Sequence, residues 1–277
     1  MKDKIVVITG ANSGMGKATA LALAAKGAHT VLICRNPASG EAAQHEIIQE
    51  SGNTKVDLLI ADLSVQKSIR ELAEKINSTY PRIDVLVNNA GLALTNYSET
   101  KDGIETTFAT NVLSMYQLTV LLIDKLKSAP AARIVNVSSS IHTSGKMSWE
   151  DIGFKKNYKL FSSYNQSKLA NILLTNEFAR RLKGTNITVN SLNPGPVKTG
   201  LARDMSTMFK LMAKLFFPSA EKASATAIYL ASSPDVNGIT GKYFAKCKPI
   251  ASSADSMNED IAKRLWNLCA EMTHTTM

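Results

Sequence analysis

Short apolar runs rich in β-branched residues alternate with longer helix-forming segments along this chain. Such runs suit strands that are buried on both faces, as in a parallel sheet covered by helices. The alternation predicts an α/β fold: one doubly wound domain over residues 1–277, with helices on both faces of a seven-stranded, mainly parallel sheet. The expected strands span residues 4–9, 30–34, 55–60, 83–87, 133–137, 187–192 and 242–244.

Helices are expected between these strands, because apolar positions there recur with helical spacing. No Pro/Gly/Ser-rich linker and no internal repeat interrupts the series. A last helix over residues 259–272 is expected to pack on the outside of the domain. The other expected helices span residues 17–26, 41–51, 64–79, 104–127, 164–183 and 220–231.

The composition excludes several classes of partner. The 277-residue chain has a formal charge of +9, but its Lys and Arg residues are scattered and not interleaved with aromatic residues. We therefore expect no nucleic-acid partner, and a basic surface that modestly attracts an anionic cofactor. The three cysteines share no C-x-x-C spacing and the four histidines are isolated, which predicts reduced thiols and no metal site.

Membrane and targeting segments are also not expected. No apolar run approaches the roughly 18 residues of a membrane span, so no transmembrane segment is expected. The first apolar strand is reached at Ile5, which leaves no room for a signal peptide. We therefore expect a soluble, cytoplasmic protein.

A glycine-rich segment, Thr9–Gly16, lies between the first strand and an Ala-rich helix. Gly10 would allow a sharp turn, Gly14 a close approach of the backbone to a pyrophosphate, and Gly16 close packing of the helix on the strand. The helix N-terminus would offer free N–H groups to the phosphates. This setting favours a Rossmann-type dinucleotide site over a Gly-rich turn without a ligand. The expected contacts are Gly10, Asn12, Ser13, Gly14, Met15 and Gly16.

The second strand ends at Cys34-Arg35-Asn36, where an NAD-selective fold would carry an acidic residue for the ribose. No acid stands there, and Arg35 would instead meet a 2′-phosphate through charge-assisted hydrogen bonds. We therefore expect NADP(H) in preference to NAD(H), with Arg35 and Asn36 at the cofactor. The alternative is that Arg35 is a solvated loop residue, and Lys17 is a weaker second candidate.

Two more segments follow the third and fourth strands, at the edge where ligands bind in such sheets. Asp62 can accept a hydrogen bond from the adenine amino group, and Leu63 can supply backbone contacts. The small residues Asn89, Ala90 and Gly91 would let the backbone run close to the adenosine ribose.

Tyr164 and Lys168 stand four residues apart in an expected helix and therefore project from the same face. A lone Y-x-x-x-K is common by chance, but this one follows the fifth strand and its exit, Ser138-Ser139-Ser140. A free tyrosine has a pKa near ~10, which is too high for efficient acid–base work at neutral pH. A nearby ammonium favours the phenolate, so we expect Lys168 to lower the pKa of Tyr164 while holding the nicotinamide ribose.

Taken in order, these motifs resemble the short-chain dehydrogenase/reductase family over nearly the full length of the chain. A finer resemblance to its retinol dehydrogenase-like branch rests on residues 34–36, 167–171, 179–184, 241–244 and 262–266. The segments that match the family are Thr9–Gly16, Asp62-Leu63, Asn88–Gly91, Asn111, Asn136–Ser139, Tyr164 with Lys168, and Pro194–Thr199.

The resemblance implies a catalytic set of Asn111, Ser139, Tyr164 and Lys168, with Ser138 as the alternative serine. Ser139 would position the carbonyl and stabilise charge on its oxygen. Asn111 would bend its helix and hold a water that links Lys168 to solvent. Reduction would then combine a hydride from the nicotinamide with a proton from Tyr164, and oxidation is the reverse.

The segment from Pro194 to Thr199 would wrap the nicotinamide, because the backbone around Val197 and the Thr199 hydroxyl can bind its carboxamide. A plain Pro/Gly loop after a strand is the alternative, and it suits Pro196 better than Thr199. The expected cofactor contacts are Pro194, Gly195, Val197 and Thr199.

Two segments are expected to face the substrate. Residues 140–163 form an insert before Tyr164, similar to one in the retinol dehydrogenase-like branch. Its Ile141 and His142 are substrate candidates, although a loop or packing role is favoured for His142. Residues 200–218 are Met-rich and amphipathic, and their position favours a lid carrying Met205 and Met208. Ordinary core and a membrane-surface helix are the alternatives for this lid.

The expected function is an NADP(H)-dependent carbonyl reductase or alcohol dehydrogenase that acts on small hydrophobic aldehydes, ketones or alcohols. Enzymes of the branch often carry an N-terminal membrane anchor that is not found in this sequence, which favours such substrates over retinoids. The alternative is a catalytically silent dinucleotide-binding redox sensor or scaffold. Because the family forms dimers and tetramers through its long helices, a homo-oligomer is a further expectation.

Overall fold

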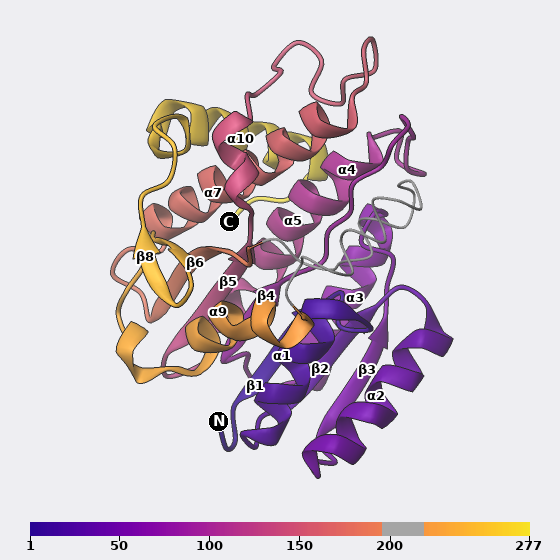
Figure 1. The fold of residues 1–277 in the computed structure, drawn as a ribbon, viewed down its shortest axis with the longest axis vertical. Coiled ribbons are helices and arrows are strands. Elements are labelled where there is room, and N and C mark those ends of the chain that lie inside the picture. The colour runs from indigo at the N-terminus through magenta and orange to yellow at the C-terminus, as the bar shows by residue number, and fades with distance from the viewer. Residues whose placement is uncertain (196–218) are drawn as a thin grey trace.

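The protein is built around one eight-stranded sheet with the strand order β3-β2-β1-β4-β5-β6-β7-β8 (Figure 1). The computed structural model describes residues 1–195 and 219–277. All neighbouring strands are parallel except β7 and β8. The strands are β1 (Ile5–Thr9), β2 (His29–Cys34), β3 (Val56–Ile60), β4 (Val85–Asn88), β5 (Ala132–Val137), β6 (Ile187–Asn193), β7 (Tyr243–Ala245) and β8 (Lys248–Ile250).

The α/β class and the mainly parallel sheet are confirmed, but the sheet has one strand more than the seven expected. The additional strand, β8, is three residues long and exposed, so it carries no buried apolar run. It pairs with β7 through a tight hairpin in which Lys246 and Cys247 adopt positive φ angles of 49° and 60°. Neither residue is a glycine, so the turn has no sequence signal of the usual kind.

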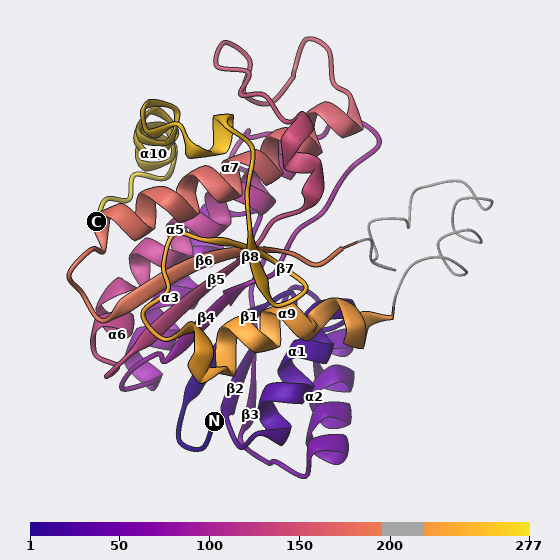
Figure 2. The ribbon, with the colours of Figure 1, turned by 60° about the vertical axis from the view of Figure 1, so that its left-hand side comes forward.

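Helices cover both faces of the sheet (Figure 2). On one face α1, α2 and α9 bury residues such as Leu23, Ile47 and Leu230. On the other face α3, α5 and α7 bury residues such as Leu72, Leu118 and Leu173. The helices are α1 (Gly14–Ala25), α2 (Pro37–Ser51), α3 (Gln66–Thr79), α4 (Thr106–Phe108), α5 (Ser114–Leu121), α6 (Ile123–Lys127), α7 (Leu160–Arg181), α9 (Ala220–Ser232) and α10 (Glu259–Thr273).

The terminal helix α10 lies outside α7 and α5, as expected for residues 259–272 (Figure 2). Its Trp266 packs edge-on against Tyr116 of α5 and Phe178 of α7, with ring centroids 4.9 and 4.7 Å apart. Aromatic edge-to-face pairs add to the stabilisation from burial itself. The helix therefore lies on the outside of α7 and α5, and its apolar face is part of the core.

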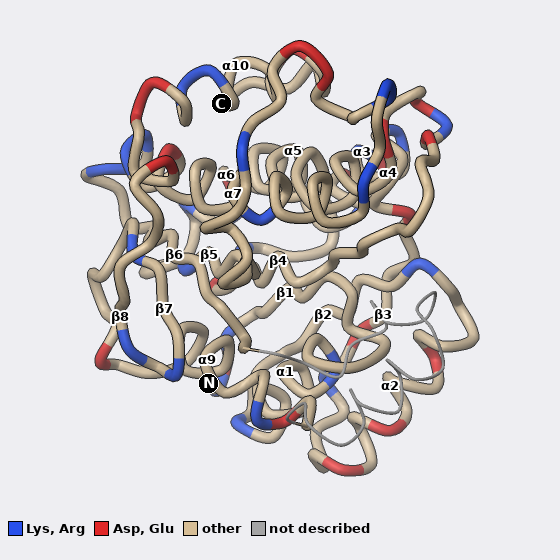
Figure 3. Tube along the Cα trace, turned by 45° about the horizontal axis from the view of Figure 1, so that its top comes forward, with Lys and Arg blue, Asp and Glu red and all other residues tan. Residues whose placement is uncertain are grey.

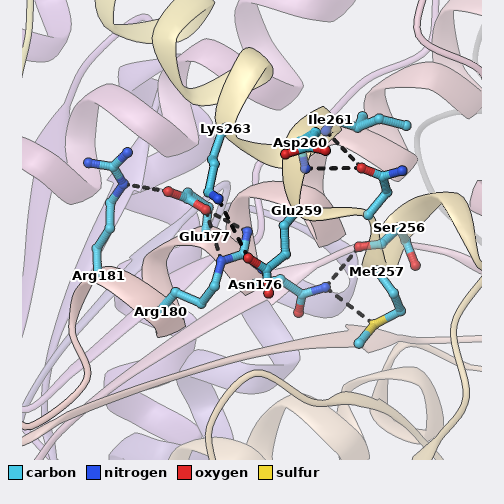
Figure 4. A network of polar contacts seen from close by, with 11 residues as sticks. Asn176, Glu177, Arg180, Arg181, Ser256, Met257, Glu259, Asp260, Ile261 and Lys263 are labelled. Atoms are coloured by element: carbon cyan, nitrogen blue, oxygen red, sulfur yellow. Dashed lines mark hydrogen bonds and ion pairs between the residues drawn. The ribbon is translucent and has the colours of Figure 1, made fainter.

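A polar network holds the start of α10 against α7 (Figure 4). The buried carboxylate of Glu177 accepts hydrogen bonds from Arg180 and Arg181, and Arg181 stacks over the Trp266 ring at 4.3 Å. The side chain of Asn176 donates to the backbone oxygen of Ser256 at 2.9 Å. Buried amides and carboxylates need hydrogen-bond partners, and these contacts supply them. Asn176 and Glu177, near the end of α7, therefore have a structural role.

Candidate active site

The candidate site lies at the carboxyl edge of the sheet, where the strand order reverses between β1 and β4. The two strand ends are tied together by side chains. The Thr9 hydroxyl accepts hydrogen bonds from the backbone N–H groups of Asn89 and Ala90, both at 2.9 Å. The Asn89 amide donates to the Thr9 carbonyl at 2.7 Å. The predicted segments after β1 and β4 are thereby brought together.

The glycine loop leaves no room for a side chain at its base. A Cβ on Gly16 would lie 2.2 Å from the Gly10 carbonyl oxygen and 2.5 Å from Asn89 Nδ2. Gly10 and Gly14 have φ angles of +65° and +54°, a region that favours glycine. These constraints explain why glycine stands at all three positions.

The N-terminus of α1 is open to a ligand. Its N-cap residue, Ser13, makes no side-chain hydrogen bond to the helix, and a Cβ on Gly14 would meet no atom within 4 Å. Helix N-termini with free N–H groups bind phosphates. The residues present therefore fit a dinucleotide. In this loop Met15 is buried and Asn12 donates to the Ser39 hydroxyl at 3.2 Å.

Arg35 is exposed directly after β2, as a phosphate-binding side chain would need to be. Within residues 1–195 and 219–277 it forms no ion pair. The second candidate, Lys17, forms an ion pair with Glu46 of α2. Asn36 caps α2, because its side chain accepts a hydrogen bond from the Ser39 N–H at 3.0 Å. Lys17 is therefore engaged within the fold, whereas Arg35 has no ion-pair partner among the described residues.

Asp62 and Leu63 follow β3, as expected. The Asp62 carboxylate accepts hydrogen bonds from the backbone and hydroxyl of Ser64, at 2.9 and 2.7 Å. Leu63 is buried. One oxygen of the Asp62 carboxylate accepts both hydrogen bonds. Among the described residues the other oxygen accepts none, so it is available to a ligand.

Asn111 lies in a π-helical turn, η1 (Ala109–Leu113), which interrupts the helix expected over residues 104–127. Its Oδ1 accepts a hydrogen bond from Leu92 N–H, and its Nδ2 donates to the Leu92 carbonyl, both at 2.8 Å. Nδ2 also donates to the Ser167 hydroxyl at 3.0 Å. The helical segment begins at Thr106, two residues later than expected, and its first irregularity falls at Asn111, the residue expected to bend it. Turns of this type recur at functional sites.

Tyr164 and Lys168 extend from α7 toward this edge. Lys168 is buried; its Nζ lies 5.4 Å from the Tyr164 ring centroid and donates to the Val137 carbonyl at 3.1 Å. A Cβ on Gly91 would lie 3.5 Å from Lys168 Nζ and 3.3 Å from Asn111 Oδ1, so the turn after β4 packs directly against both groups. The structure thus gathers Asn111, Tyr164 and Lys168, as the sequence predicted.

The shift in the pKa of Tyr164 is opposite in direction to the one expected from the sequence. Burial raises the pKa of Tyr164 to about 12, whereas the ammonium was expected to lower it. Burial lowers the pKa of Lys168 to about 8. Loss of hydration disfavours the charged form of each group and is the cause of both shifts. At neutral pH the site therefore holds a neutral phenol beside a protonated lysine.

The two candidate serines have different environments. Ser138 is buried, and its hydroxyl donates to the Lys168 carbonyl at 2.7 Å. Ser139 is half-buried, and its hydroxyl accepts only a long contact of 3.5 Å from the Ile141 N–H among the described residues. Ser138 is therefore committed to fastening β5 to α7, whereas the Ser139 hydroxyl is available to a substrate. This geometry favours Ser139.

His142 has a structural environment. It is buried, its Nδ1 lies 2.8 Å from the Ser139 carbonyl oxygen, and its Nε2 accepts from the Ser253 N–H at 3.1 Å. Burial lowers the pKa of His142, so the ring is neutral at physiological pH. Both ring nitrogens are used inside the fold, which argues against a substrate contact. Its neighbour Ile141 is half-buried and stays a candidate.

The insert over residues 140–163 is fixed to α7 and α10 by side chains. Gln166 accepts from the Ser148 N–H and donates to the Ile152 carbonyl, both at 2.7 Å. Trp149 is covered by the guanidinium of Arg264 at 4.3 Å. These contacts make the insert a wall of defined shape beside α7.

The sequence reasoning missed Phe161, which lies one turn before Tyr164 on α7. Its side chain is 65% exposed, the largest value among the exposed apolar residues of the described chain. Residues three apart share a helix face, and helical side chains lean toward the N-terminus, so Tyr164 leans toward Phe161. The spacing itself was the available signal.

Part of the expected site lies outside the described residues. Pro194 and Gly195 are described, and Gly195 has a φ angle of +80° with its N–H donating to Asn193 Oδ1 at 2.9 Å. The expected cofactor contacts Val197 and Thr199 lie outside the described residues. The lid over residues 200–218, with Met205 and Met208, lies outside them too.

Charge and metal ligands are dispersed. Figure 3 shows Lys and Arg distributed along the described trace among Asp and Glu. No cluster of three or more His, Cys, Asp or Glu suited to a metal ion occurs in residues 1–195 and 219–277. In the same part of the chain, no helix has the length and apolarity needed to cross a membrane.

Comparison with known proteins gives consistent matches. The family model described as short chain dehydrogenase matches residues 4–209. Retinol dehydrogenase 14 of Mus musculus is 41% identical over 288 residues, covering 98% of this chain and 86% of its own. Retinol dehydrogenase 13 of Homo sapiens is 40% identical over 272 residues, covering 95% and 82%. A solved structure of an uncharacterized protein from Mycobacterium Paratuberculosis has a TM-score of 0.81 at 30% identity, covering 99% of this chain and 94% of its own.

Proposed function

The chain belongs to the short-chain dehydrogenase family, and on that premise we propose that it is an NADP(H)-dependent enzyme that interconverts a hydrophobic carbonyl compound and its alcohol. The family makes it an oxidoreductase that uses a nicotinamide dinucleotide. One observation carries the proposal. The Tyr164 phenol and the buried Lys168 ammonium lie together at the strand edge that also holds the open glycine loop.

The cofactor would be held by the loop from Gly10 to Gly16, by Asp62 and by the segment after β4. Arg35 supports NADP(H) in preference to NAD(H), because it is exposed at the ribose end of the loop and no acid stands beside it there. When bound, the nicotinamide supplies a hydride to a carbonyl carbon or takes one from an alcohol carbon.

The proton step belongs to Tyr164. With a pKa of about 12 the phenol is protonated at neutral pH, which is the form that donates a proton to the carbonyl oxygen during reduction. The Lys168 ammonium stabilises the phenolate left behind. The half-buried Ser139 hydroxyl is suited to hold the carbonyl oxygen in place. At neutral pH the free site therefore holds the proton that reduction consumes.

The substrate class is inferred from the surroundings of Tyr164 and from the relatives. The exposed Phe161 precedes Tyr164 by three residues on α7 and therefore shares its helix face, where an apolar ligand would cover it. The relatives are called retinol dehydrogenases. An extended apolar aldehyde or ketone, with retinoid-like compounds among those to be tested, is the proposed substrate.

The test of the reaction is turnover with NADPH and a panel of apolar aldehydes and ketones. Replacing Tyr164 by Phe should reduce kcat at least about 100-fold, because general acid catalysis contributes that much. Tyr158→Phe is the matched control, since its hydroxyl donates to the Leu94 carbonyl at 3.0 Å, and it should retain kcat. Undiminished turnover in Tyr164→Phe would remove the catalytic role. Dinucleotide binding without any turnover by the wild type would instead support the redox sensor or scaffold.

The test of cofactor preference is Arg35→Ala. Loss of a charge-assisted contact of about 1.5–3 kcal/mol should raise KM for NADPH about 10- to 100-fold and leave KM for NADH nearly unchanged. Lys26→Ala removes the same charge from the far end of α1 and should change neither value. Equal effects of Arg35→Ala on both cofactors would show that Arg35 does not contact the 2′-phosphate.

A further inference from the structure

A single carbonyl on β5 holds two donors from α7. Lys168 Nζ donates to the Val137 oxygen at 3.1 Å, and Asn171 Nδ2 donates to the same oxygen at 3.2 Å. Asn171 follows Lys168 by three residues and therefore shares its helix face. Both side chains are buried, each 4% exposed. A carbonyl oxygen has two lone pairs, so these donors fill it.

The carbonyl itself is rigidly placed. On one side the Ser138 hydroxyl donates to the Lys168 backbone oxygen at 2.7 Å. On the other, Asn136 Nδ2 donates to the Thr175 hydroxyl at 2.9 Å, and that hydroxyl donates to the Asn171 backbone oxygen at 2.7 Å. Every residue in this seam is buried, so α7 cannot slide along β5 without breaking buried hydrogen bonds.

Burial of the Asn171 side-chain oxygen, Oδ1, costs free energy. Its Oδ1 is buried and has no hydrogen-bond partner among the described residues. An unpartnered buried acceptor costs about 1–3 kcal/mol, which an apolar side chain of similar size would avoid. The hydrogen bond from Asn171 Nδ2 to the Val137 oxygen is therefore the interaction that accounts for an asparagine at this position.

Building on the proposed function, we propose that Asn171 is a positioning residue for Lys168. By filling the second acceptor position of the Val137 carbonyl, it weakens the hold of that carbonyl on the ammonium. Lys168 Nζ is then kept available to the Tyr164 phenol and to the cofactor ribose. Without Asn171, the half-satisfied carbonyl would hold the ammonium more tightly and stabilise its charged form.

The surroundings of Lys168 make this effect measurable. Tyr164 is the titratable group that faces it from α7, and burial is the cause that shifts the Lys168 pKa. The other elements present uncharged groups: the Val137 carbonyl from β5, the Asn111 amide from η1 and Gly91 after β4. A change at Asn171 therefore acts on a lysine with no competing charge against it among the described residues.

The experiment compares Asn171→Leu with Asn176→Leu. Both variants delete a buried amide from α7, but Asn176 lies about two helical turns beyond Lys168 and donates to the backbone oxygen of Ser256 (Figure 4). The ionisation of Lys168 is followed by NMR of the cofactor-free protein carrying lysine labelled with ¹³C at Cε, with the signal assigned by its loss in Lys168→Met. Asn171→Ala is measured in parallel in case the leucine variant does not fold.

Asn171→Leu and Asn171→Ala should raise the midpoint of the Lys168 titration by about half a pH unit or more, and Asn176→Leu should leave it unchanged. The alkaline limb of kcat should move in the same direction, with kcat itself reduced about fivefold. A titration midpoint that is the same in all variants would overturn the inference. Because the titration needs no turnover, an inactive wild type would contradict the proposed function and leave this result to be judged separately.

Discussion

The two sides of Tyr164 are built by different means. On the side proposed for the cofactor, the positions are set by backbone: glycines at the end of β1, and strand ends locked by Thr9 and Asn89. On the side proposed for the substrate, the wall is an insert held by side chains, such as the Gln166 amide and the stacked Arg264 and Trp149 pair.

This difference predicts how each side responds to change. A backbone-built site tolerates almost no added atom, because the surrounding chain is packed as densely as a crystal. A wall held by side chains can be altered one residue at a time, with local effects. A substitution on the cofactor side should therefore weaken cofactor binding as a whole. A substitution on the substrate side should change the substrate selectivity in small steps.

The largest effect is expected from Gly16→Ala. Its new Cβ would lie 2.2 Å from the Gly10 carbonyl oxygen, so the loop must move away from the helix. We expect the dissociation constant for NADPH, measured by fluorescence titration, to rise at least about 100-fold, since several phosphate contacts depend on one loop shape. Gly103→Ala is the control, because it adds a Cβ in open space at a φ angle of +72°. Normal NADPH binding by Gly16→Ala would contradict a backbone-built cofactor side.

The pH dependence should give an intermediate effect. Lys168, with its pKa lowered to about 8, loses its proton as the pH rises through that value, while Tyr164 stays protonated to about 12. The rate of carbonyl reduction should therefore be constant below pH 8 and fall up to about tenfold per pH unit above it. Because Lys168 belongs to the cofactor side, the midpoint should be the same for short and long aldehydes. A midpoint that depends on the aldehyde would break the separation of the two sides.

The smallest effect is expected from Phe161→Ser. Loss of apolar contact worth about 1 kcal/mol should lower kcat/KM for long apolar aldehydes about fivefold. Short aldehydes and the KM for NADPH should be unaffected. Met257→Ser removes another exposed apolar side chain, 58% exposed and near α10, and serves as the control. An equal loss with long and short aldehydes would show that Phe161 does not border the substrate.

The sequence predicted the backbone-built side well because its signals are local. Gly10, Gly14 and Gly16 are needed for conformational and steric reasons that adjoining residues reveal. Five of the six strands from β1 to β6 carry a buried apolar run, and β3, whose only buried residue is Val56, still has an apolar sequence; the existence of all six could therefore be predicted although their ends shifted.

The features that escaped prediction depend on distant partners. The π-helical turn at Asn111 forms where its amide binds the Leu92 backbone, a contact across 19 residues. For His142 a loop or packing role was expected, but its hydrogen-bond partner Ser253, 111 residues away, could not be predicted. The pKa of Tyr164 depends on how fully the fold buries the phenol, which spacing to Lys168 does not reveal.

The buried Lys168 also affects the protein as a whole. A lysine in the unfolded chain has a pKa near ~10.4, whereas in the fold its pKa is about 8. Below pH 8 Lys168 is protonated in the folded chain, although its burial disfavours the charged form. Between pH 8 and 10 this lysine is protonated in the unfolded chain but largely neutral in the folded one. The free energy of unfolding should accordingly rise across that interval, by an amount on the order of 3 kcal/mol at most. The group that equips this site for proton chemistry thus makes the protein less stable at neutral pH than an apolar residue there would.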